Sequence, residues 1–300
     1  MQPTDSAALR YFREVAATGS VTRAGANLFV APSAVSRQIR LLEEELGVAL
    51  FTRGARGMTL TTAGHLVLEF ATRTRQLADD LRSELGAARH SVRGHVIIAT
   101  VEGPLSGYVP ETLETLAASH PEIRIDVRVA GSHDVSAAVA EGTAHRGFVF
   151  GPPTRSDIVA LKSQPLPLAL MVRPDHPLGN RRACSVRDLG DHPVALPGKQ
   201  FGIRQELDRA CAEARAQLRI AYEADSLALL RDIAVRTGAA IFMTAKDTAT
   251  ELAQGTLVRV PLTDRRLTRT QLTLVRGLTP DSSPATRIVS DALLAAMNDT

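Results

Sequence analysis

Residues 28–47 read LFVAPSAVSRQIRLLEEELG, and they give the strongest indication of how the N-terminal part of the chain folds. Its apolar positions are spaced by four, three and four residues, which is the period of a helix that packs one face on a core. We expect four residues to anchor that face: Val35, Ile39, Leu42 and Leu46. Small and hydroxylated residues open the helix and three glutamates close it, so only its N-terminal half could approach a polyanion such as DNA.

Two shorter helices are predicted before this one. Asp5 can cap a first helix, whose apolar residues Leu9, Phe12 and Ala16 recur at helical spacing until residues 17–19 end it. Ser20 can cap a second helix at 21–28, and residues 29–31 turn the chain into the third. Two helices joined by a turn of about three residues form a helix-turn-helix, which presents its second helix to the major groove.

A short hairpin is predicted directly after the third helix. Residues 50–51 and 58–60 have the pattern of two strands around a glycine-containing tip at 53–57. Arg53 and Arg56 lie at that tip, where they could contact phosphates or enter a minor groove. The order of these pieces predicts a winged helix-turn-helix.

Residues 7–70 closely resemble the N-terminal domain of the LysR-type transcriptional regulators. The resemblance implies sequence-specific binding of double-stranded DNA. It assigns phosphate contacts to Thr22 and Ser36, a major-groove contact to Arg37, and wing contacts to Arg53 and Arg56. With the other polar or leading residues of the third helix, the predicted DNA-binding set is Thr22, Pro32, Ser33, Ser36, Arg37, Arg40, Arg53 and Arg56.

The chain departs from this family at the start of the third helix. The family usually has a polar cap followed by Gln, whereas this chain has Ala31 followed by Pro32. Proline suits a first helical turn, where its missing N–H would find no partner. We therefore expect the fold to survive with a weaker cap, and the preferred DNA sequence to differ because a base-reading amide is absent.

Charge and composition fit this interpretation. The net charge is +3, and residues 1–93 carry all of it, with twelve Arg and no Lys against nine acidic residues. A chain of 300 residues with 44% hydrophobic residues predicts two or three globular domains. No apolar run approaches the ~20 residues that span a bilayer, no signal peptide is evident, and only Cys184 and Cys211 are present, so we expect a cytoplasmic protein without a disulfide framework.

Residues 61–93 predict one long helix with an apolar stripe. The stripe is formed by Leu66, Phe70, Leu77, Leu81 and Ala88. Arg73 and Asp80 interrupt a strict heptad, which favours limited helix pairing over a regular coiled coil. In the family the corresponding helix joins subunits, which implies a homodimer or homotetramer; packing of the stripe on its own domain is the alternative.

Beyond a hinge at 91–94, strands alternate with helices, which predicts an α/β effector domain of two lobes. A βαβαβ order over residues 95–150 predicts a parallel sheet, and a strand at 166–172 begins the second lobe. Two connections should cross between the lobes, near residues 163–167 and 264–270. The predicted domains are a winged helix-turn-helix at 1–60, a linker helix at 61–93 and an effector domain at 94–300, with lobe I at 94–165 and 269–300 and lobe II at 166–268.

This second part resembles the effector domain of the same family, which has the architecture of periplasmic binding proteins. The matching phrases include residues 94–98, 120–123, 172–178 and 223–227, while His145, Ala240 and Ala245 depart from the usual pattern. Carried over residue by residue, the resemblance places a small-molecule effector against Thr100, Glu102, Ser132, Gln200, Phe201, Arg204 and Ser226. Each of these polar residues could equally be an ordinary loop hydroxyl or helix cap.

The chemistry of that effector stays open at the sequence level. Hydroxyls, backbone N–H groups at helix N-termini and Arg204 would suit a carboxylate or another small organic anion. Glu102 could instead accept hydrogen bonds from a sugar or an amine.

Other functions are less well supported by the sequence. A redox switch at Cys184 and Cys211 would need an exposed, electropositive thiol, and a solute-binding protein would have no use for residues 1–60. The eight His residues show no paired metal-ligand spacing, and no nucleophile elbow, phosphate-binding loop or dinucleotide fingerprint is present. We therefore predict a regulator that needs no cofactor, no metal and no catalytic residue.

Overall fold

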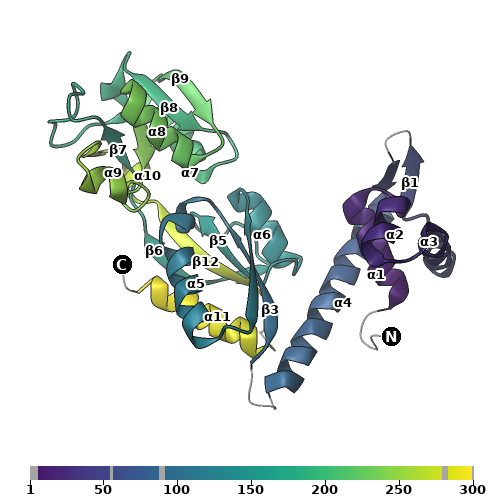
Figure 1. Cartoon of the computed structure of the whole chain (residues 1–300). Coiled ribbons are helices and arrows are strands. Elements are labelled where there is room, and N and C mark those ends of the chain that lie inside the picture. The colour runs from purple at the N-terminus through teal and green to yellow at the C-terminus, as the bar shows by residue number, and fades with distance from the viewer. Residues whose placement is uncertain (1–5, 55–56, 88–91, 279–282, 299–300) are drawn as a thin grey trace. The chain divides into compact units, whose positions relative to one another are not determined.

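The computed structural model describes residues 6–54, 57–87, 92–278 and 283–298; within these ranges the side chains of Arg53, Gln76, Asp79, Asp80 and residues 82–87 are not described. The chain folds into two compact units, which we describe separately. The first unit carries helices α1 to α4 and a small hairpin, and the second is an α/β domain of two lobes (Figure 1).

Three helices form the body of the first unit: α1 (Ala7–Thr18), α2 (Val21–Leu28) and α3 (Pro32–Leu46). The predicted cap Asp5 lies outside the described residues, and Ser6 caps α1 by accepting a hydrogen bond from the Leu9 amide at 3.2 Å. Ser20 caps α2 as predicted, accepting from the Arg23 amide at 3.3 Å. The capping serines thus determine where the first two helices begin.

The turn between α2 and α3 depends on a close backbone approach. Gly25 is buried, and a Cβ added there would lie 2.8 Å from the Val30 carbonyl oxygen. Phe29 adopts a left-handed conformation, with φ of 55°, and its side chain is 96% exposed. A side chain at position 25 would push the turn away from α2, so glycine allows the two helices to meet at this angle.

The core of this unit confirms most of the predicted helix anchors. Val35, Ile39 and Leu42 are buried against α1, and the rings of Phe12 and Phe51 pack at 5.1 Å between centroids. The prediction for Leu46 was wrong, because its side chain is 45% exposed. Leu46 is the last residue of α3, beside the left-handed C-cap Gly47, and lies beyond the end of the core.

The predicted hairpin is present as β1 (Phe51–Gly54) and β2 (Gly57–Leu60), which pair antiparallel. It is attached to the helices through the Met58 amide, which donates to the Gly19 carbonyl at 2.9 Å. A side chain at Gly57 would collide with that same carbonyl, with a Cβ 2.5 Å from its oxygen. The hairpin is therefore packed against the turn between α1 and α2, and Arg56 at its tip lies outside the described residues.

The long helix α4 (Thr62–Ala87) follows the hairpin. Its Ala71 is fully buried in the core of the first unit. The predicted apolar stripe lies on another face of the helix, and its described side chains are exposed in the single chain: Leu66 by 66%, Phe70 by 61%, Leu77 by 61% and Leu81 by 45%. Ala88, the last residue of the predicted stripe, lies outside the described residues. The four described stripe residues are thus not covered by their own domain.

Lobe I is built on a five-stranded sheet in the order β4-β3-β5-β12-β6. Its strands are β3 (Gly94–Thr100), β4 (Ile123–Val129), β5 (Arg146–Phe150), β6 (Ile158–Pro165) and β12 (Gln271–Gly277). The parallel pairing expected within the first three strands is found between β3 and β5. The sheet as a whole is mixed, which corrects the predicted parallel sheet, because the returning strand β12 runs antiparallel to both β5 and β6.

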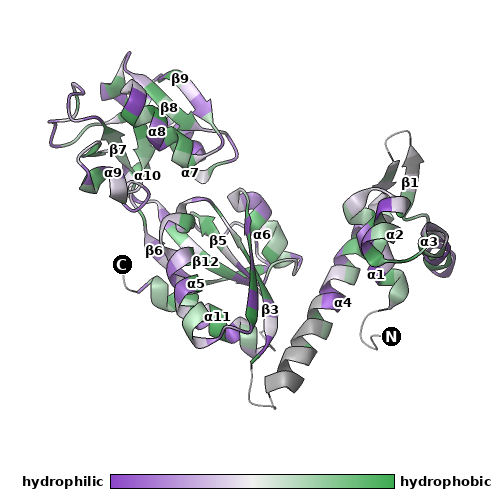
Figure 2. Ribbon diagram, in the orientation of Figure 1, coloured by the Kyte–Doolittle hydropathy of each residue, from purple (hydrophilic) through white to green (hydrophobic). Residues whose placement is uncertain are grey.

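Helices cover both faces of that sheet: α5 (Tyr108–Ser119), α6 (Ser132–Ala140) and α11 (Pro284–Ala296) (Figure 1). Phe148 of β5 stacks on Tyr108 of α5, with ring centroids 6.1 Å apart. The next residue, Val149, packs with Val135 and Val139 of α6 on the opposite face. This alternation explains why β3 and β5 carry hydrophobic residues along their length (Figure 2).

Lobe II contains two small sheets. The first is β10-β7-β11, formed by β7 (Ala169–Val172), β10 (Ile241–Met243) and β11 (Val258–Pro261), and the second pairs β8 (Pro193–Pro197) in parallel with β9 (Arg219–Ala224). Four helices accompany them: α7 (Gly202–Ala214), α8 (Leu227–Thr237), α9 (Ala249–Ala253) and α10 (Arg265–Thr268). All four residues of β7 are buried, so this strand is the centre of the lobe II core.

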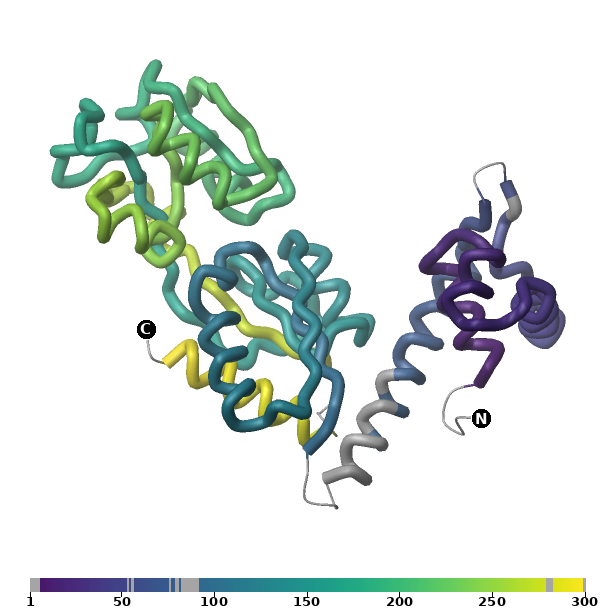
Figure 3. Tube along the Cα trace, in the orientation of Figure 1, coloured from purple at the N-terminus to yellow at the C-terminus, as the bar shows by residue number. Residues whose placement is uncertain are grey.

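The two predicted crossings between the lobes run side by side (Figure 3). The Leu166 amide donates to the Thr270 carbonyl at 2.8 Å, the Thr270 hydroxyl donates back to Leu166 at 2.5 Å, and the Leu168 amide donates to the Leu267 carbonyl at 2.9 Å. Bending one crossing therefore requires the other to bend with it, as expected of a two-stranded hinge.

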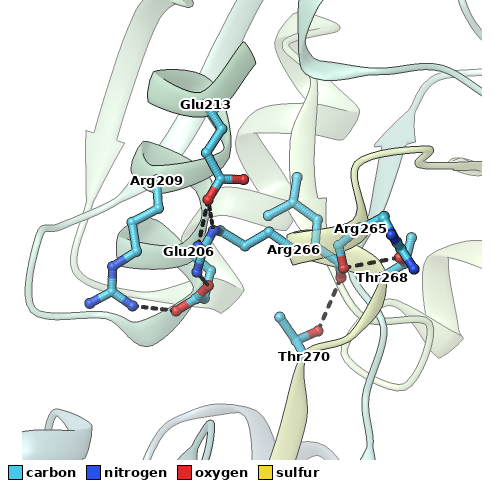
Figure 4. Close-up of polar contacts among 8 residues, drawn as sticks. Glu206, Arg209, Glu213, Arg265, Arg266, Thr268 and Thr270 are labelled. Atoms are coloured by element: carbon cyan, nitrogen blue, oxygen red, sulfur yellow. Dashed lines mark hydrogen bonds and ion pairs between the residues drawn. The ribbon is translucent and has the colours of Figure 1, made fainter. Parts of the chain in front are cut away.

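An ion-pair network holds the second crossing to lobe II (Figure 4). Arg266 of α10 contacts Glu213 at 2.9 Å and Glu206 at 3.1 Å, and both acids lie on α7. Glu206 also accepts a hydrogen bond from Arg209 of the same helix, at 2.6 Å. These ion pairs fix α10 to α7 of lobe II, whereas Leu166 and Thr270, where the two crossings pair, lie outside the network.

Candidate nucleic-acid interface and ligand cavity

The first half of α3 presents the predicted polar residues to the surface. Pro32, Ser33, Arg37 and Arg40 are exposed, Ser36 is half-buried, and Thr22 is exposed on α2. Figure 2 shows hydrophilic residues on the outer side of α3. The residues that would face a duplex and the residues that anchor the helix thus occupy opposite faces of the same helix.

Arg37 and Arg40 differ in the contacts that their side chains form. Arg37 forms no hydrogen bond or ion pair with any residue that the structure describes. Arg40 lies 3.5 Å from Glu44, but both side chains are largely exposed, at 69% and 61%. Such a surface pair contributes little, so both guanidinium groups can turn toward a phosphate or a base edge.

The N-terminus of α3 is open. Ala31 occupies the cap position and supplies no side-chain hydrogen bond, and Pro32 follows it. The weaker cap expected from the sequence is therefore present. An uncapped helix N-terminus keeps amide donors and a partial positive charge for an anion such as a phosphate.

The acidic end of α3 has a structural role. One oxygen of Glu43, Oε1, accepts hydrogen bonds from the Leu50 amide at 2.7 Å and the Phe51 amide at 3.3 Å. This carboxylate connects the end of α3 to the first strand of the hairpin. The Arg53 side chain and Arg56, predicted to contact DNA from that hairpin, lie outside the described residues.

A cavity of about 230 Å³ lies between the lobes of the α/β domain. It is lined by Val101, Glu102, Gly103, Pro104, Val129, Ala130, Gly131, Phe150, Leu166, Gln200, Phe201, Gly202, Ile203, Asp225, Leu227, Thr244, Asp247 and Leu272. Three of the seven predicted effector-binding residues are among them: Glu102, Gln200 and Phe201. Both lobes and one of the crossings contribute to its wall.

Thr100 and Ser132 hold the backbone behind the cavity wall. The Thr100 hydroxyl is fully buried and donates to the Val101 carbonyl at 2.8 Å. The Ser132 hydroxyl accepts from the Phe150 amide at 3.0 Å. These hydroxyls position the lining residues Val101 and Phe150.

Arg204 does not line the cavity either. Its buried guanidinium donates to Glu223 at 2.8 Å, to Asp208 at 2.9 Å and to the Pro197 carbonyl at 3.0 Å. These acidic partners raise the pKa of Arg204 against the opposing effect of burial. The positive charge expected to meet an anionic effector is thus already neutralised inside lobe II.

Ser226 and Glu102 meet at the start of α8. The Ser226 hydroxyl caps this helix by accepting a hydrogen bond from the Leu229 amide at 3.4 Å. Glu102 extends from lobe I and its Oε1 accepts hydrogen bonds from the Leu227 amide at 2.8 Å and from the Ser226 hydroxyl at 3.3 Å. A carboxylate of the chain itself therefore occupies the helix N-terminus that faces the cavity.

Three polar residues of the cavity wall were not predicted from the sequence: Thr244, Asp225 and Asp247. Asp247 is 5% exposed, and its Oδ2 accepts from the Thr244 hydroxyl at 2.7 Å. Burial raises the pKa of Asp247 and the nearby charge of Glu102 adds to the rise, while hydrogen bonds from Thr244 and the charge of Arg231 oppose it. Thr244 and Asp247 follow the buried strand β10, so the end of that strand is the sequence signal that could have identified them.

A second contact joins the lobes beside the cavity. The ammonium group of Lys246, from lobe II, lies 3.6 Å from the centre of the Tyr108 ring and 3.7 Å from the Glu111 carboxylate, both on α5 of lobe I. Lys246 therefore points at α5, while its neighbour Asp247 lines the cavity.

The two cysteines lack the features of a redox switch. Burial raises the pKa of Cys184 to about 11, and that of Cys211 to about 11, with neighbouring aspartates adding to both shifts. Both side chains are thus protonated thiols at neutral pH, which are poor nucleophiles. Among the described residues, no group of three His, Cys, Asp or Glu side chains is arranged to hold a metal ion, and no helix is long and apolar enough to cross a membrane.

Two domain families match this chain. The family described as "Bacterial regulatory helix-turn-helix protein, lysR family" matches residues 6–65, and the family described as "LysR substrate binding domain" matches residues 89–298. A curated relative, the HTH-type transcriptional regulator BbuR of Bordetella bronchiseptica, is 30% identical over 289 residues, which cover 96% of this chain and 89% of the relative.

Solved structures show the same fold. A full-length OxyR variant from Pseudomonas aeruginosa aligns with a TM-score of 0.73 at 18% identity, covering 95% of this chain and 93% of that chain. Full-length CbnR in complex with its target DNA aligns with a TM-score of 0.68 at 22% identity, covering 96% and 98%. Together with the match of both domain families, these findings show that the chain belongs to the LysR family of transcriptional regulators, with an N-terminal helix-turn-helix and a C-terminal two-lobed substrate-binding domain.

Proposed function

We propose that this regulator reads double-stranded DNA with the exposed face of α3 and responds to a small molecule held in the cavity between its lobes. The observation that carries the first part is Arg37, an exposed guanidinium on the N-terminal half of α3 that has no partner among the described residues. The similarity in fold to CbnR bound to its target DNA supports this use of the helix.

The remaining predicted contacts fit around this one. Thr22 and Ser36 would bind phosphate, Pro32, Ser33 and Arg40 would lie along the groove, and Arg53 and Arg56 would follow the hairpin into the flanking DNA. We propose residues 1–60 as the DNA-binding domain, 61–93 as the linker helix and 94–300 as the effector domain. Pairing through α4 would place two copies of α3 on a two-fold DNA site.

A small molecule in the cavity could control this arrangement only if it binds one relation of the lobes better than another. The crossings at Leu166 and Thr270 supply a hinge for such a change. We propose a non-enzymatic role, because the relatives are transcriptional regulators, and we place it in the cytoplasm, where a bacterial regulator meets DNA. The match of residues 6–65 to a helix-turn-helix family speaks against a solute-binding protein.

The test is a DNA-binding titration with the DNA upstream of the chain's own gene. Arg37→Ala should weaken binding by about 1–3 kcal/mol, because a base contact is lost. Arg259→Ala is the matched control: Arg259 is exposed on β11 of the effector domain, and its loss removes the same charge. If Arg37→Ala bound this DNA as tightly as Arg259→Ala at moderate salt, α3 would not be the reading helix.

A further inference from the structure

The cavity between the lobes is acidic as well as apolar. Three carboxylates line it: Glu102 from lobe I, and Asp225 and Asp247 from lobe II. Among the described residues of its wall there is no Lys, Arg or His, and most of the rest is apolar, including Val129, Phe150, Phe201 and Leu272. The wall therefore carries negative charge with no positive charge of its own.

Three basic residues close to the cavity wall are engaged by other groups. Lys246 lies over the Tyr108 ring and beside Glu111, and the Arg204 guanidinium pairs with Asp208 and Glu223. Arg231 pairs with Glu251 at 3.1 Å. Within the described part of the chain, none of the three lining carboxylates forms an ion pair.

The usual place for an anion is already filled. The N-terminus of α8 faces the cavity, and its Leu227 amide donates to Glu102 at 2.8 Å. Asp225, just before the same helix, accepts a hydrogen bond from the Gln200 amide at 2.6 Å, so that side-chain donor is also occupied. An anionic ligand would have to displace the chain's own carboxylate and would then meet two others at close range.

Asp247 adds an argument from burial. Its carboxyl group is 5% exposed and its Oδ2 accepts a hydrogen bond from Thr244, but among the described residues it forms no ion pair, and the charge of Arg231 offsets the effect of burial only in part. Burying an ionised carboxylate without a counter-charge is costly, and a positively charged ligand at the cavity wall would remove that cost. The apolar side chains opposite could hold the uncharged part of the same ligand.

We propose that the effector of this regulator is a small organic cation, an ammonium or guanidinium group on a compact apolar body, bound between Glu102 of lobe I and Asp247 of lobe II. This assignment rests on the proposed function, in which the cavity is the effector site. Of the effector classes that the sequence left open, the proposal favours the amine expected from Glu102 over the anion expected from Arg204.

The geometry also connects the ligand to lobe closure. Glu102 and Asp247 belong to different lobes, and the charge of Glu102 disfavours the ionised form of Asp247. A cation between them contacts both carboxylates only when the lobes are close, so it binds the closed arrangement more tightly than an open one. This differential affinity is what a ligand needs in order to shift the conformation of the domain.

The test uses three small probes of similar shape and different charge on the full-length protein at neutral pH and fixed salt. The probes are benzylammonium, benzyl alcohol and benzoate. Thermal shifts should show stabilisation by benzylammonium, less by benzyl alcohol and none by benzoate, because a ligand that binds the folded state raises its Tm. Calorimetric titration then gives the affinity of each probe.

Two variants locate the binding. Asp247→Asn and Glu102→Gln keep the size and hydrogen-bonding shape of the side chains and should each weaken benzylammonium binding on the order of tenfold, because a charge-assisted contact is lost. Asp291→Asn is the matched control, since Asp291 is an exposed carboxylate on α11 and does not line the cavity. Circular dichroism and the Tm without probe confirm that each variant is folded.

Three outcomes would overturn the proposal: benzoate binding as well as benzylammonium, undiminished benzylammonium binding by Asp247→Asn, or no response to any of the three probes. The DNA titration with Arg37→Ala and Arg259→Ala does not depend on the cavity. If that titration behaves as expected while the probes fail, only the ligand class is wrong. If α3 also proves not to read DNA, the proposed function itself fails.

Discussion

The buried Asp247 carboxylate costs stability in the ligand-free protein, while the same group is proposed to contact the effector. Burial raises its pKa, with the charge of Glu102 adding to the rise. A carboxyl group whose pKa is raised by folding holds its proton more tightly when folded than when unfolded. Its contribution to stability is therefore greatest at acidic pH and is lost as the pH rises through the folded pKa.

This gives a pH prediction for the ligand-free protein. Relative to the parent, Asp247→Asn should be most stabilising above the raised pKa of Asp247, and this advantage should shrink as the pH falls towards the ordinary aspartate range near about 4. Urea denaturation of both proteins across that pH range, followed by circular dichroism, measures the difference. A difference that stays constant with pH would mean that Asp247 titrates as an ordinary aspartate, and Asp291→Asn serves as the control.

The hairpin glycines allow a second prediction at the residue scale. Gly57 has φ of 109° and a Cβ there would lie 2.5 Å from the Gly19 carbonyl oxygen, whereas a Cβ at Gly54 meets nothing within 4 Å. Gly57→Ala should destabilise the DNA-binding domain by about 1–3 kcal/mol through strain and displacement of the hairpin. Gly54→Ala should change stability little. Thermal unfolding of the two variants separates these effects, and equal losses would contradict the packing of the hairpin on the α1–α2 turn.

The helices α2 and α3 differ in how their N-termini are capped. The α2 helix begins with a capping serine that accepts from the Arg23 amide, while α3 begins at Ala31 without any side-chain cap. Both cap positions have extended backbone, with ψ of 123° at Ser20 and 137° at Ala31. A serine at position 31 could therefore cap α3 without moving the chain.

We expect Ala31→Ser to stabilise the DNA-binding domain by about 0.5–2 kcal/mol, since one unpaired amide of α3 gains a partner. Ser20→Ala, which removes an existing cap from α2, should destabilise the domain by a similar amount. Amide hydrogen exchange in α3 and α2 reports each change locally. If Ala31→Ser left exchange in α3 unchanged, the first-turn amides would already be satisfied.

Strands were harder to predict than helices. The βαβαβ order predicted over residues 95–150 is found as β3, α5, β4, α6 and β5. The strand β6 (Ile158–Pro165) was not predicted, because its residues IVALKSQP carry a lysine and other polar side chains that obscure the alternation. It is a strand because β12 returns from lobe II and pairs with it, a contact more than a hundred residues away in sequence.

For the molecule as a whole, α4 exposes an apolar stripe that no other described part of the chain covers. Leu66, Phe70 and Leu77 each expose more than half of their side chains in the single chain. An apolar stripe of this kind on a long helix is favourable only when a partner covers it. Pairing through this stripe would also bring two DNA-binding domains together.

A charge placed in the stripe should therefore separate the subunits. Phe70→Glu combined with Leu77→Glu should shift the protein from dimer or tetramer to smaller species in sedimentation experiments and weaken binding to a two-fold DNA site. Leu278→Glu is the control, since Leu278 is a comparably exposed apolar residue of the effector domain, at 58%. An unchanged sedimentation profile for the α4 variant would show that subunits associate elsewhere.

The sequence alone was sufficient for features whose physics is local or periodic. Helical spacing identified Val35, Ile39 and Leu42 as buried anchors, a serine marked the start of α2, and paired crossings were expected where the strand order required the chain to leave and return. These features depend on neighbours a few residues away, so they can be read from a short window of sequence.

Which polar side chains face the cavity depends on contacts between elements that are far apart in the sequence. Arg204 and Ser132 were predicted to contact the effector, but their polar groups bind the protein itself, whereas Asp247 was not predicted and lines the wall. A side chain's partners come from whichever elements pack against it, and here those elements are separated by long stretches of sequence. The acidity of the cavity follows from Glu102 of one lobe meeting Asp247 of the other, a juxtaposition that no local pattern contains.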